Sequence, residues 1–203
     1  VIALAYLKKS ERHDEILKVA MNMIAEESIT SITARRVAEQ AGIAVGQIHH
    51  HFKSIGQLKA QALIKVTDEL VAQADRELAQ QSVINKIISL VSPIEGKEGL
   101  VIRKLWNEAI FLAERDPDIK QACKQSTEEW HKTLVKLLEE AIAAKKIAEN
   151  DADELAWRLI ALSCGIDNLA IVDEFAFTKE AVKTHILQLL QLQNPPETTL
   201  AME

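Results

Sequence analysis

The segment ITARRVAEQAGIAVGQIHHHFKSIGQL, residues 32–58, constrains the fold more than any other part of the chain. Thr33 is placed to N-cap a short helix, because its hydroxyl can accept a hydrogen bond from a backbone N–H that the first turn leaves unpaired. Gly42 stands where that helix must end, because glycine adopts a positive φ at little cost. Ile48 can anchor a second helix, about residues 44–51, against the first. The pattern therefore predicts two short helices joined by a tight turn, which is a helix-turn-helix unit.

The second helix carries polar side chains opposite its apolar anchor, namely Gln47, His49 and His50. A short helix with a packed back and a polar front fits the major groove of DNA, where glutamine can pair with adenine and protonated histidine can contact phosphate. Arg35 and Arg36, early in the first helix, can bind guanine or phosphate, and the alternative is that both are solvated surface arginines. We favour the DNA contact for Arg35. Consecutive histidines on a helix point about 100° apart, so we expect no metal site among them.

This combination resembles the N-terminal DNA-binding domain of the TetR family of bacterial transcriptional regulators. The resemblance rests on Thr33, Val37-Ala38, Ala41-Gly42-Ile43, the helix through His51, Phe52 and Ser54, and on Arg12, Ile16-Leu17, Ala20 and Ile24 upstream. It implies an all-α fold of about nine helices, in which an N-terminal three-helix helix-turn-helix domain is joined by a long helix to a helical-bundle effector and dimerisation domain. The predicted DNA-binding residues are Thr33, Arg35, Arg36, Ala44, Val45, Gln47, His49, His50, Lys53 and Lys59.

Two departures from the family pattern affect the predicted DNA contacts. Position 44 is alanine, where family recognition helices usually begin with serine or a similar cap. The chain then reads Ser54-Ile55-Gly56 where the family often has Ser-Lys-Glu, so the lysine that touches a phosphate in family members is absent. Lys53 and Lys59 are the nearest candidates to replace it.

The charge of the chain is unevenly distributed. Its net charge is −6, which taken alone argues against binding to nucleic acid. Residues 1–62, however, hold eight Lys/Arg and six Asp/Glu, giving +2, while the remainder holds 16 basic and 24 acidic residues, giving −8. A mildly basic N-terminal part on an acidic body is the asymmetry expected of a DNA-binding domain attached to another domain. Nonspecific affinity for DNA should be modest and depend strongly on salt.

Several features predict a cytoplasmic protein. The sequence contains no run of about 18 apolar residues, so we expect no membrane span. Its short apolar N-terminal piece precedes the positive charges, which is the reverse of a secretory signal. Cys123 and Cys164 are too few for a disulfide framework, and we expect both to be buried as small apolar residues.

Apolar residues recur at helical spacing along most of the chain, and signals such as Ser54-x-x-Gln57 and Asp116-Pro117 mark helix starts. We divide the chain into a DNA-binding helix-turn-helix domain at residues 1–56, an effector-binding and dimerisation domain at 57–193, and a tail at 194–203 that is expected to be disordered. No internal repeat is present.

Two apolar helices near the C-terminus, roughly residues 151–172 and 178–193, are predicted to form a four-helix interface between two copies of the chain. The first of them is apolar nearly all round, which predicts burial on more than one side. The resemblance implies the same interface, because family members dimerise through their final two helices. Two-fold symmetry would place two recognition helices about 34–36 Å apart, which is one turn of DNA.

A pocket for a small-molecule effector is the least constrained part of the prediction. Aromatic side chains and isolated polar groups on apolar helices can line a cavity, and ordinary core packing explains each of them equally well. The candidates are Trp106, Phe111, Trp130, Cys164 and Asn168. The sequence does not specify the ligand.

Two alternatives remain open beside the regulator. Glu128-x-x-His131 has the spacing used by di-iron helical bundles, which suggests a helical-bundle metal enzyme, although the body contains no second motif of this kind. Ala44 and Ile55 suggest instead an interaction module whose helix-turn-helix domain has lost DNA binding. We predict a ligand-responsive transcriptional repressor that binds a palindromic operator as a homodimer, and we expect no enzymatic activity, no cofactor and no metal.

Overall fold

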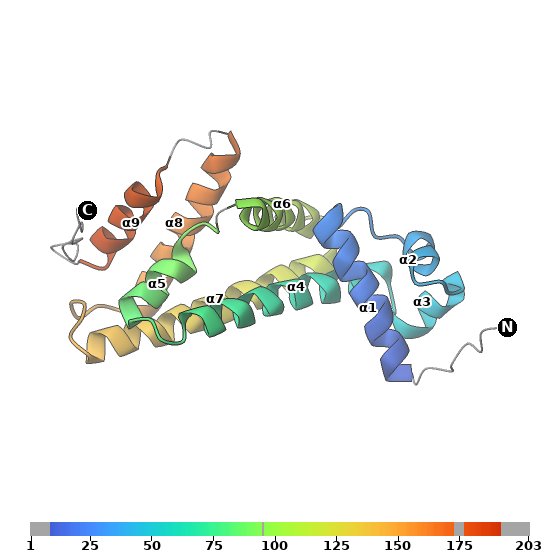
Figure 1. The fold of residues 1–203 in the computed structure, drawn as a ribbon, viewed down its shortest axis with the longest axis horizontal. Coiled ribbons are helices and arrows are strands. Elements are labelled where there is room, and N and C mark those ends of the chain that lie inside the picture. The colour runs from blue at the N-terminus through green and yellow to red at the C-terminus, as the bar shows by residue number, and fades with distance from the viewer. Residues whose placement is uncertain (1–8, 95, 173–176, 192–203) are drawn as a thin grey trace, which may run out of the picture. The chain divides into compact units, whose positions relative to one another are not determined.

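The computed structural model describes residues 9–94, 96–172 and 177–191, and this part of the chain contains helices and no strands (Figure 1). The helices are α1 (Lys9–Glu26), α2 (Ala34–Gln40), α3 (Val45–His51), α4 (Ile55–Leu78), α5 (Val83–Val91), α6 (Gly96–Ala113), α7 (Pro117–Ala143), α8 (Ala152–Val172) and α9 (Lys179–Leu189). The predicted all-α fold is confirmed, and the helices predicted at residues 44–51, 151–172 and 178–193 lie within a few residues of their expected positions. The tail at 194–203 lies outside the described residues.

Several helix starts carry side-chain caps, including those that the sequence predicted at Thr33 and Asp116. In each cap, a side-chain oxygen accepts a hydrogen bond from the backbone N–H three positions later, at 3.1–3.3 Å. The capping residues are Thr33, Ser82, Asp116, Asp151 and Thr178. Each such cap stabilises its helix by about 1 kcal/mol. Helix boundaries in this chain therefore follow from local sequence.

The chain packs as two compact units, which we call unit 1 and unit 2. Unit 1 consists of Val1–Gln73 and Val101–Ser126, and unit 2 consists of Ala74–Leu100 and Thr127–Glu203. Each unit has its own cluster of buried apolar side chains. This division concerns packing, so the functional boundary that we predict at residue 56 stays a prediction.

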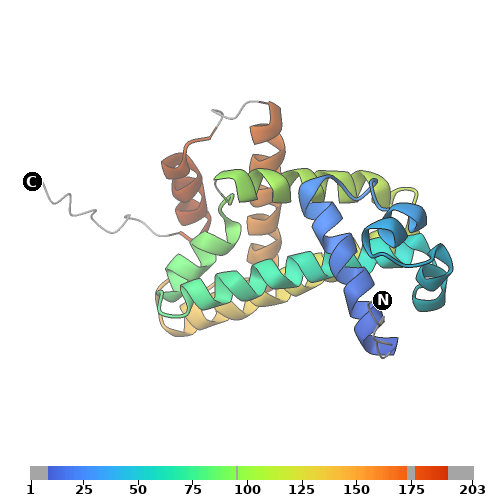
Figure 2. The same cartoon turned by 45° about the vertical axis from the view of Figure 1, so that its right-hand side comes forward.

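The core of unit 1 fixes the arrangement of the first three helices, which pack against one another (Figures 1 and 2). Its buried side chains come from every helical segment of the unit and include Ile16, Ile24, Val37, Ala38, Ile48, Phe52, Leu58, Leu63, Leu105, Ala109 and Ile119. The segments at 101–113 and 117–126, from α6 and α7, thus complete the core on which the helix-turn-helix rests. The domain division predicted from sequence assigns these segments to the effector-binding and dimerisation domain at residues 57–193.

The core of unit 2 forms where α5, α8 and α9 pack together and where the C-terminal part of α7 adds Leu134, Leu138 and Ala141. Helix α8 contributes one side to this core, with Leu155, Leu159 and Ile166 as examples of its buried side chains. The predicted burial of α8 on more than one side is not found within a single chain.

The other side of α8 exposes several large apolar side chains. Trp157 is 45% exposed, Leu169 51% and Val172 86%. Cys164 also lies on this side, so the prediction that it is buried was wrong, whereas Cys123 is half-buried. By length and mean hydropathy α8 could cross a membrane, but buried helices in other proteins meet the same criterion, and one third of its most apolar window is buried here (33%).

Candidate nucleic-acid interface

The turn between α2 and α3 has the geometry that its glycine predicted. Gly42 has φ +64°, and the N–H groups of Gly42 and Ile43 donate to the carbonyls of Glu39 and Ala38 at 3.2 and 2.9 Å. These bonds satisfy carbonyl groups that the end of α2 would otherwise leave unpaired. A Cβ at Gly42 would meet no atom within 4 Å, so the backbone conformation, and not lack of space, requires glycine here.

Helix α3 has a buried back and an exposed front, as predicted. Ile48 is 1% exposed, and Phe52 at the end of the helix is 2% exposed. The remaining side of the helix is open to solvent and consists of Val45, Gly46, Gln47, His49 and His50. Ala44 occupies the N-cap position and makes no side-chain hydrogen bond. Helix α3 therefore lacks a side-chain cap, as the sequence indicated.

Histidine rings and Phe52 join α1 to the end of α3. The ring of His13 stacks on Phe52 with 4.5 Å between centroids, and the ring of His51 lies 6.4 Å from His13. His51 is half-buried and makes an edge contact with the exposed His50. These contacts fix the C-terminal end of α3 against α1.

The two arginines of α2 have different surroundings. Arg35 is exposed, whereas the Arg36 guanidinium forms two hydrogen bonds with the Glu27 carboxylate, at 2.6 and 2.8 Å, and a third with the Ser31 carbonyl at 3.2 Å. The hydrogen bond from Arg36 lowers the pKa of the Glu27 carboxyl below its usual value. Arg36 thus ties α2 to the end of α1, and a phosphate would have to share it with Glu27. Thr33, which accepts a backbone N–H through its oxygen, keeps its hydroxyl proton for a further acceptor.

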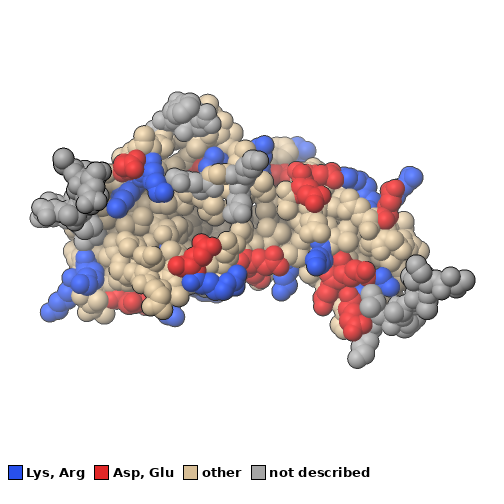
Figure 3. Space-filling view, viewed as in Figure 1, with Lys and Arg blue, Asp and Glu red and all other residues tan. Residues whose placement is uncertain are grey.

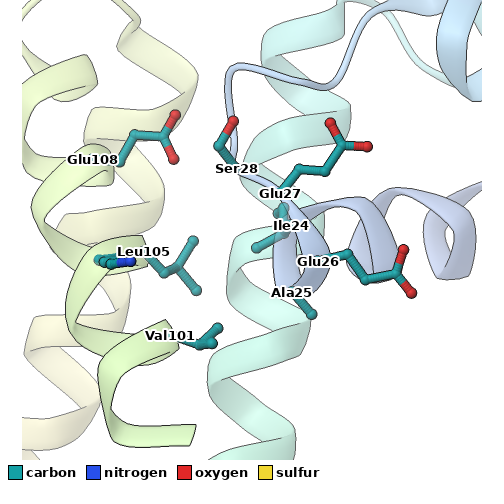
Figure 4. A pocket seen from close by; sticks show the side chains of 9 residues that line it. Ile24, Ala25, Glu26, Glu27, Ser28, Val101, Leu105 and Glu108 are labelled. Atoms are coloured by element: carbon teal, nitrogen blue, oxygen red, sulfur yellow. The ribbon is translucent and has the colours of Figure 1, made fainter. Parts of the chain in front are cut away.

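Glu108 of α6 holds the loop between α1 and α2, a role that no local sequence pattern indicated. Its carboxylate accepts the N–H of Ile29 at 2.8 Å, the N–H of Thr30 at 2.9 Å and the Thr30 hydroxyl at 2.8 Å. Figure 4 shows Glu108 and Leu105 on α6 facing Ile24 and Ser28 at the end of α1, across a cavity of about 140 Å³. Because the loop leads directly into α2, Glu108 fixes the start of the helix-turn-helix.

Helix α4 begins with a capping arrangement that includes a residue of α7. The Gln57 N–H donates to Ser54 Oγ at 2.8 Å, and Gln57 Oε1 accepts the Lys53 N–H at 2.8 Å. The predicted capping box is therefore present, with its return bond to Lys53 in place of Ser54. The Ser54 hydroxyl in turn donates to Asp118 Oδ2 at 2.8 Å. Sequence reasoning missed Asp118, which lies 64 residues away.

The basic residues proposed for phosphate contacts are few. Lys53 is exposed and Lys59 is half-buried on the first turns of α4. On the face drawn in Figure 3, basic and acidic side chains are interspersed. DNA affinity in such a protein would depend on a small number of placed contacts more than on a broad positive field.

The residues proposed for an effector pocket are spread over both units. Trp106 is half-buried in unit 1, and Phe111 is 61% exposed there, with the Arg115 guanidinium 5.6 Å from its ring centre. In unit 2, Trp130 packs against the core, while Cys164 and Asn168 are exposed neighbours on α8. None of the five lines the cavity beside Glu108, and their role stays a prediction.

The pair proposed for a metal enzyme has other contacts. The ring of His131 stacks on Trp157 with 4.3 Å between centroids, and its Nε2 lies 3.2 Å from the Asp153 carbonyl oxygen. Glu128 is exposed. Within residues 9–94, 96–172 and 177–191, no three His, Cys, Asp or Glu side chains are grouped to hold a metal ion.

Comparison with known proteins agrees with this geometry over most of the chain. The family model described as bacterial regulatory proteins of the tetR family matches residues 16–62, and that of the C-terminal region of BetI-type transcriptional repressors matches residues 95–193. The chain is 26% identical over 182 residues to the HTH-type transcriptional regulator PksA of Bacillus subtilis (strain 168), covering 88% of this chain and 87% of PksA.

Solved structures show the same fold. A TetR-family transcriptional regulator from Rhodococcus sp. matches with a TM-score of 0.72 and 25% identity, covering 90% of this chain and 97% of that one. A regulator from Saccharomonospora viridis in complex with choline matches with a TM-score of 0.71 and 21% identity, covering 91% and 97%. With two family models matching its two parts and regulators of this fold as its relatives, the chain belongs to the TetR family of bacterial transcriptional regulators.

Proposed function

We propose that the chain is a ligand-responsive repressor that binds a palindromic DNA operator as a homodimer in the cytoplasm. The observation that carries this proposal is the exposed front of α3, where Gln47, His49 and His50 project from a helix whose back is fixed by Ile48. Gln47 is proposed to read a base edge, and the two histidines to contact bases or phosphate. Arg35 on α2 is the further exposed cation beside this surface.

Thr33, Ala44, Val45, Lys53 and Lys59 complete the proposed contact surface. Thr33 and Lys53 supply a hydroxyl and an ammonium group for phosphate, and both side chains are exposed. Val45 is 43% exposed, and an apolar side chain at this position can contact a thymine methyl group. Arg36 is proposed mainly to position α2, since Glu27 holds its guanidinium.

Dimerisation is proposed to bury the exposed side of α8. Trp157, Leu169 and Ile171 are each about half exposed, and leaving this apolar surface in water costs free energy. A second copy of α8 would cover it. The polar outer side of α9, with Lys183 and Gln188 exposed, would lie at the rim of such an interface. One recognition helix reads few bases, so two-fold pairing would also supply the specificity that a single head lacks.

An effector is proposed to bind within residues 57–193 and to change the affinity for the operator. It can do so only if it binds differently to the DNA-competent and DNA-incompetent arrangements of the dimer. One structural neighbour was solved with choline, so choline is the first compound to test. The relatives are transcriptional regulators, and we propose that this chain likewise acts by binding and not by catalysis.

The decisive experiment measures binding of the purified protein to duplexes that tile the DNA upstream of its own gene, at two salt concentrations. The double variant Arg35→Ala, Gln47→Ala should lose selective binding. The control Lys136→Ala, Gln125→Ala removes one basic side chain and one glutamine from exposed positions of α7 and should bind like the unmodified protein. Absence of selectivity over mixed-sequence DNA, with and without choline, would contradict the proposal and favour an interaction module.

A further inference from the structure

Two carboxylates from the start of α7 lie on the first turn of α4. Asp118 Oδ2 accepts the Ser54 hydroxyl at 2.8 Å. A Cβ atom at Gly56 would lie 2.7 Å from the same Asp118 oxygen and 3.0 and 3.2 Å from the two carboxylate oxygens of Asp116. Both carboxylates therefore lie directly against the backbone of Gly56, and any larger residue there would displace them.

This packing accounts for the departure of the sequence Ser54-Ile55-Gly56 from the Ser-Lys-Glu pattern of the family. A glutamate at position 56 would collide with Asp116 and Asp118 and would add a third negative charge to the same place. The glycine and the two aspartates form one structural feature, although about 60 residues separate them in sequence.

The position of the carboxylates is relevant to the proposed binding of the helix-turn-helix domain to DNA. The first turn of a helix carries the positive end of the helix dipole, and here Asp116 and Asp118 lie against Gly56 in the first turn of α4. Phe52 caps the end of α3 only two residues before Ser54, and the exposed Lys53 lies between them. A phosphate that approaches Lys53 would meet the exposed Asp118 carboxylate close by, and like charges repel.

We propose that Asp118, held on Ser54 with Asp116 beside it, is an autoinhibitory contact that lowers the affinity of the head for DNA. The inference depends on the DNA-binding function proposed above. The carboxylate accepts the Ser54 hydroxyl and lies against the first turn of α4, where a DNA phosphate would otherwise find a hydroxyl donor and the positive end of a helix dipole. Displacement of the start of α7 from α4 would release the hydroxyl and the helix end together, and would increase affinity.

The test compares three variants by fluorescence anisotropy with a short labelled duplex of mixed sequence, over a series of salt concentrations. Asp118→Asn keeps an oxygen for the Ser54 hydroxyl and removes the charge. Gly56→Ala keeps both charges and displaces the carboxylates by its Cβ. Glu114→Gln removes a charge from an exposed residue of the same α6–α7 connection and serves as control. Urea unfolding of each variant confirms that all are folded.

Asp118→Asn should bind about 3- to 10-fold more tightly than the unmodified protein at low salt, and the gain should shrink as salt rises. Gly56→Ala should also bind more tightly, and Glu114→Gln should change affinity by less than about 2-fold. Equal affinities of Asp118→Asn and Glu114→Gln, or weaker binding by Asp118→Asn, would overturn the inference. A gain with Asp118→Asn but none with Gly56→Ala would show a net-charge effect and overturn the contact. Failure of the unmodified protein to bind any duplex would instead refute the DNA-binding proposal itself.

Discussion

Glu108 offers the sharpest test of how unit 1 holds its helix-turn-helix. Replacing Glu108 with alanine removes the acceptor for the Ile29 N–H, the Thr30 N–H and the Thr30 hydroxyl, all within 2.9 Å. Ile29 is fully buried, with 0% exposure, whereas Thr30 is exposed, so water can replace the carboxylate at Thr30 more readily than at Ile29. The main cost is therefore the unpaired N–H of Ile29.

The expected magnitude follows from these three bonds. A hydrogen bond to a charged group contributes about 1.5–3 kcal/mol, and a buried donor left unpaired costs about 1–3 kcal/mol. Because the carboxylate is only half-buried and Thr30 is solvated, we expect Glu108→Ala to lower the free energy of unfolding by about 2–3 kcal/mol. Glu108→Gln should cost about 1–2 kcal/mol, because its amide oxygen can still accept one N–H while its NH₂ group faces the other donor.

The assay is urea unfolding followed by tryptophan fluorescence. Trp106 lies in unit 1, whereas Trp130 and Trp157 lie in unit 2, so a Trp130→Phe, Trp157→Phe background reports unit 1 alone. Glu114→Ala, an exposed residue just beyond α6, is the control and should change stability by less than about 0.5 kcal/mol. If Glu108→Ala lies within that same limit, the hydrogen bonds to the loop do not hold it and the reasoning is refuted.

Three further predictions concern the turn, the dimer and a thiol. Gly42→Ala should lower the stability of unit 1 by about 1 kcal/mol or more in urea unfolding, because φ at this residue is +64°. Gly46→Ala, inside α3 and with open space around it, should be neutral or stabilising. Equal effects of the two substitutions would contradict the backbone argument. Leu169→Asp should convert the proposed homodimer to monomer in analytical ultracentrifugation at micromolar concentration, and an unchanged mass would place the interface elsewhere. Partial desolvation of the Cys164 thiol by its neighbours, and then the negative charge of Asp167, raise the pKa of this exposed residue, so the thiol should be alkylated slowly at neutral pH and faster as pH rises. Asp167→Asn should increase the rate by stabilising the thiolate, and an unchanged rate in that variant would exclude the charge effect.

The helix-turn-helix could be predicted because its signals are local. Thr33 caps a helix that begins at the next residue, Gly42 ends it, and Ile48 anchors the following helix, all within one short segment. The α8 prediction failed in one respect for the opposite reason. An apolar composition states that a helix side will be covered, but it does not state whether the same chain or a second copy covers it, and Cys164 was misplaced accordingly.

The contacts that position the helix-turn-helix within unit 1 were not predictable from local patterns. Glu108 and Ile29 are 79 residues apart, and no property of an isolated glutamate in a helix indicates which loop it will bind. Asp118 left one indirect signal, because Gly56 replaces a charged position of the family pattern at the start of α4. Gly56 has no positive φ that would require glycine, and the approach of Asp116 and Asp118 to its backbone accounts for the residue.

The composition of the unit 1 core limits how this protein can be divided or recombined. Leu105, Ala109, Ile119 and Ala122 are each at most 4% exposed and belong to the same cluster as the helix-turn-helix residues. A fragment ending at residue 56 would lack all four and would present their apolar partners to water. A hybrid regulator that joins residues 1–56 to the effector-binding domain of another protein would lack the same core residues. A transferable DNA-binding domain must therefore include residues 101–126, or be redesigned where they pack.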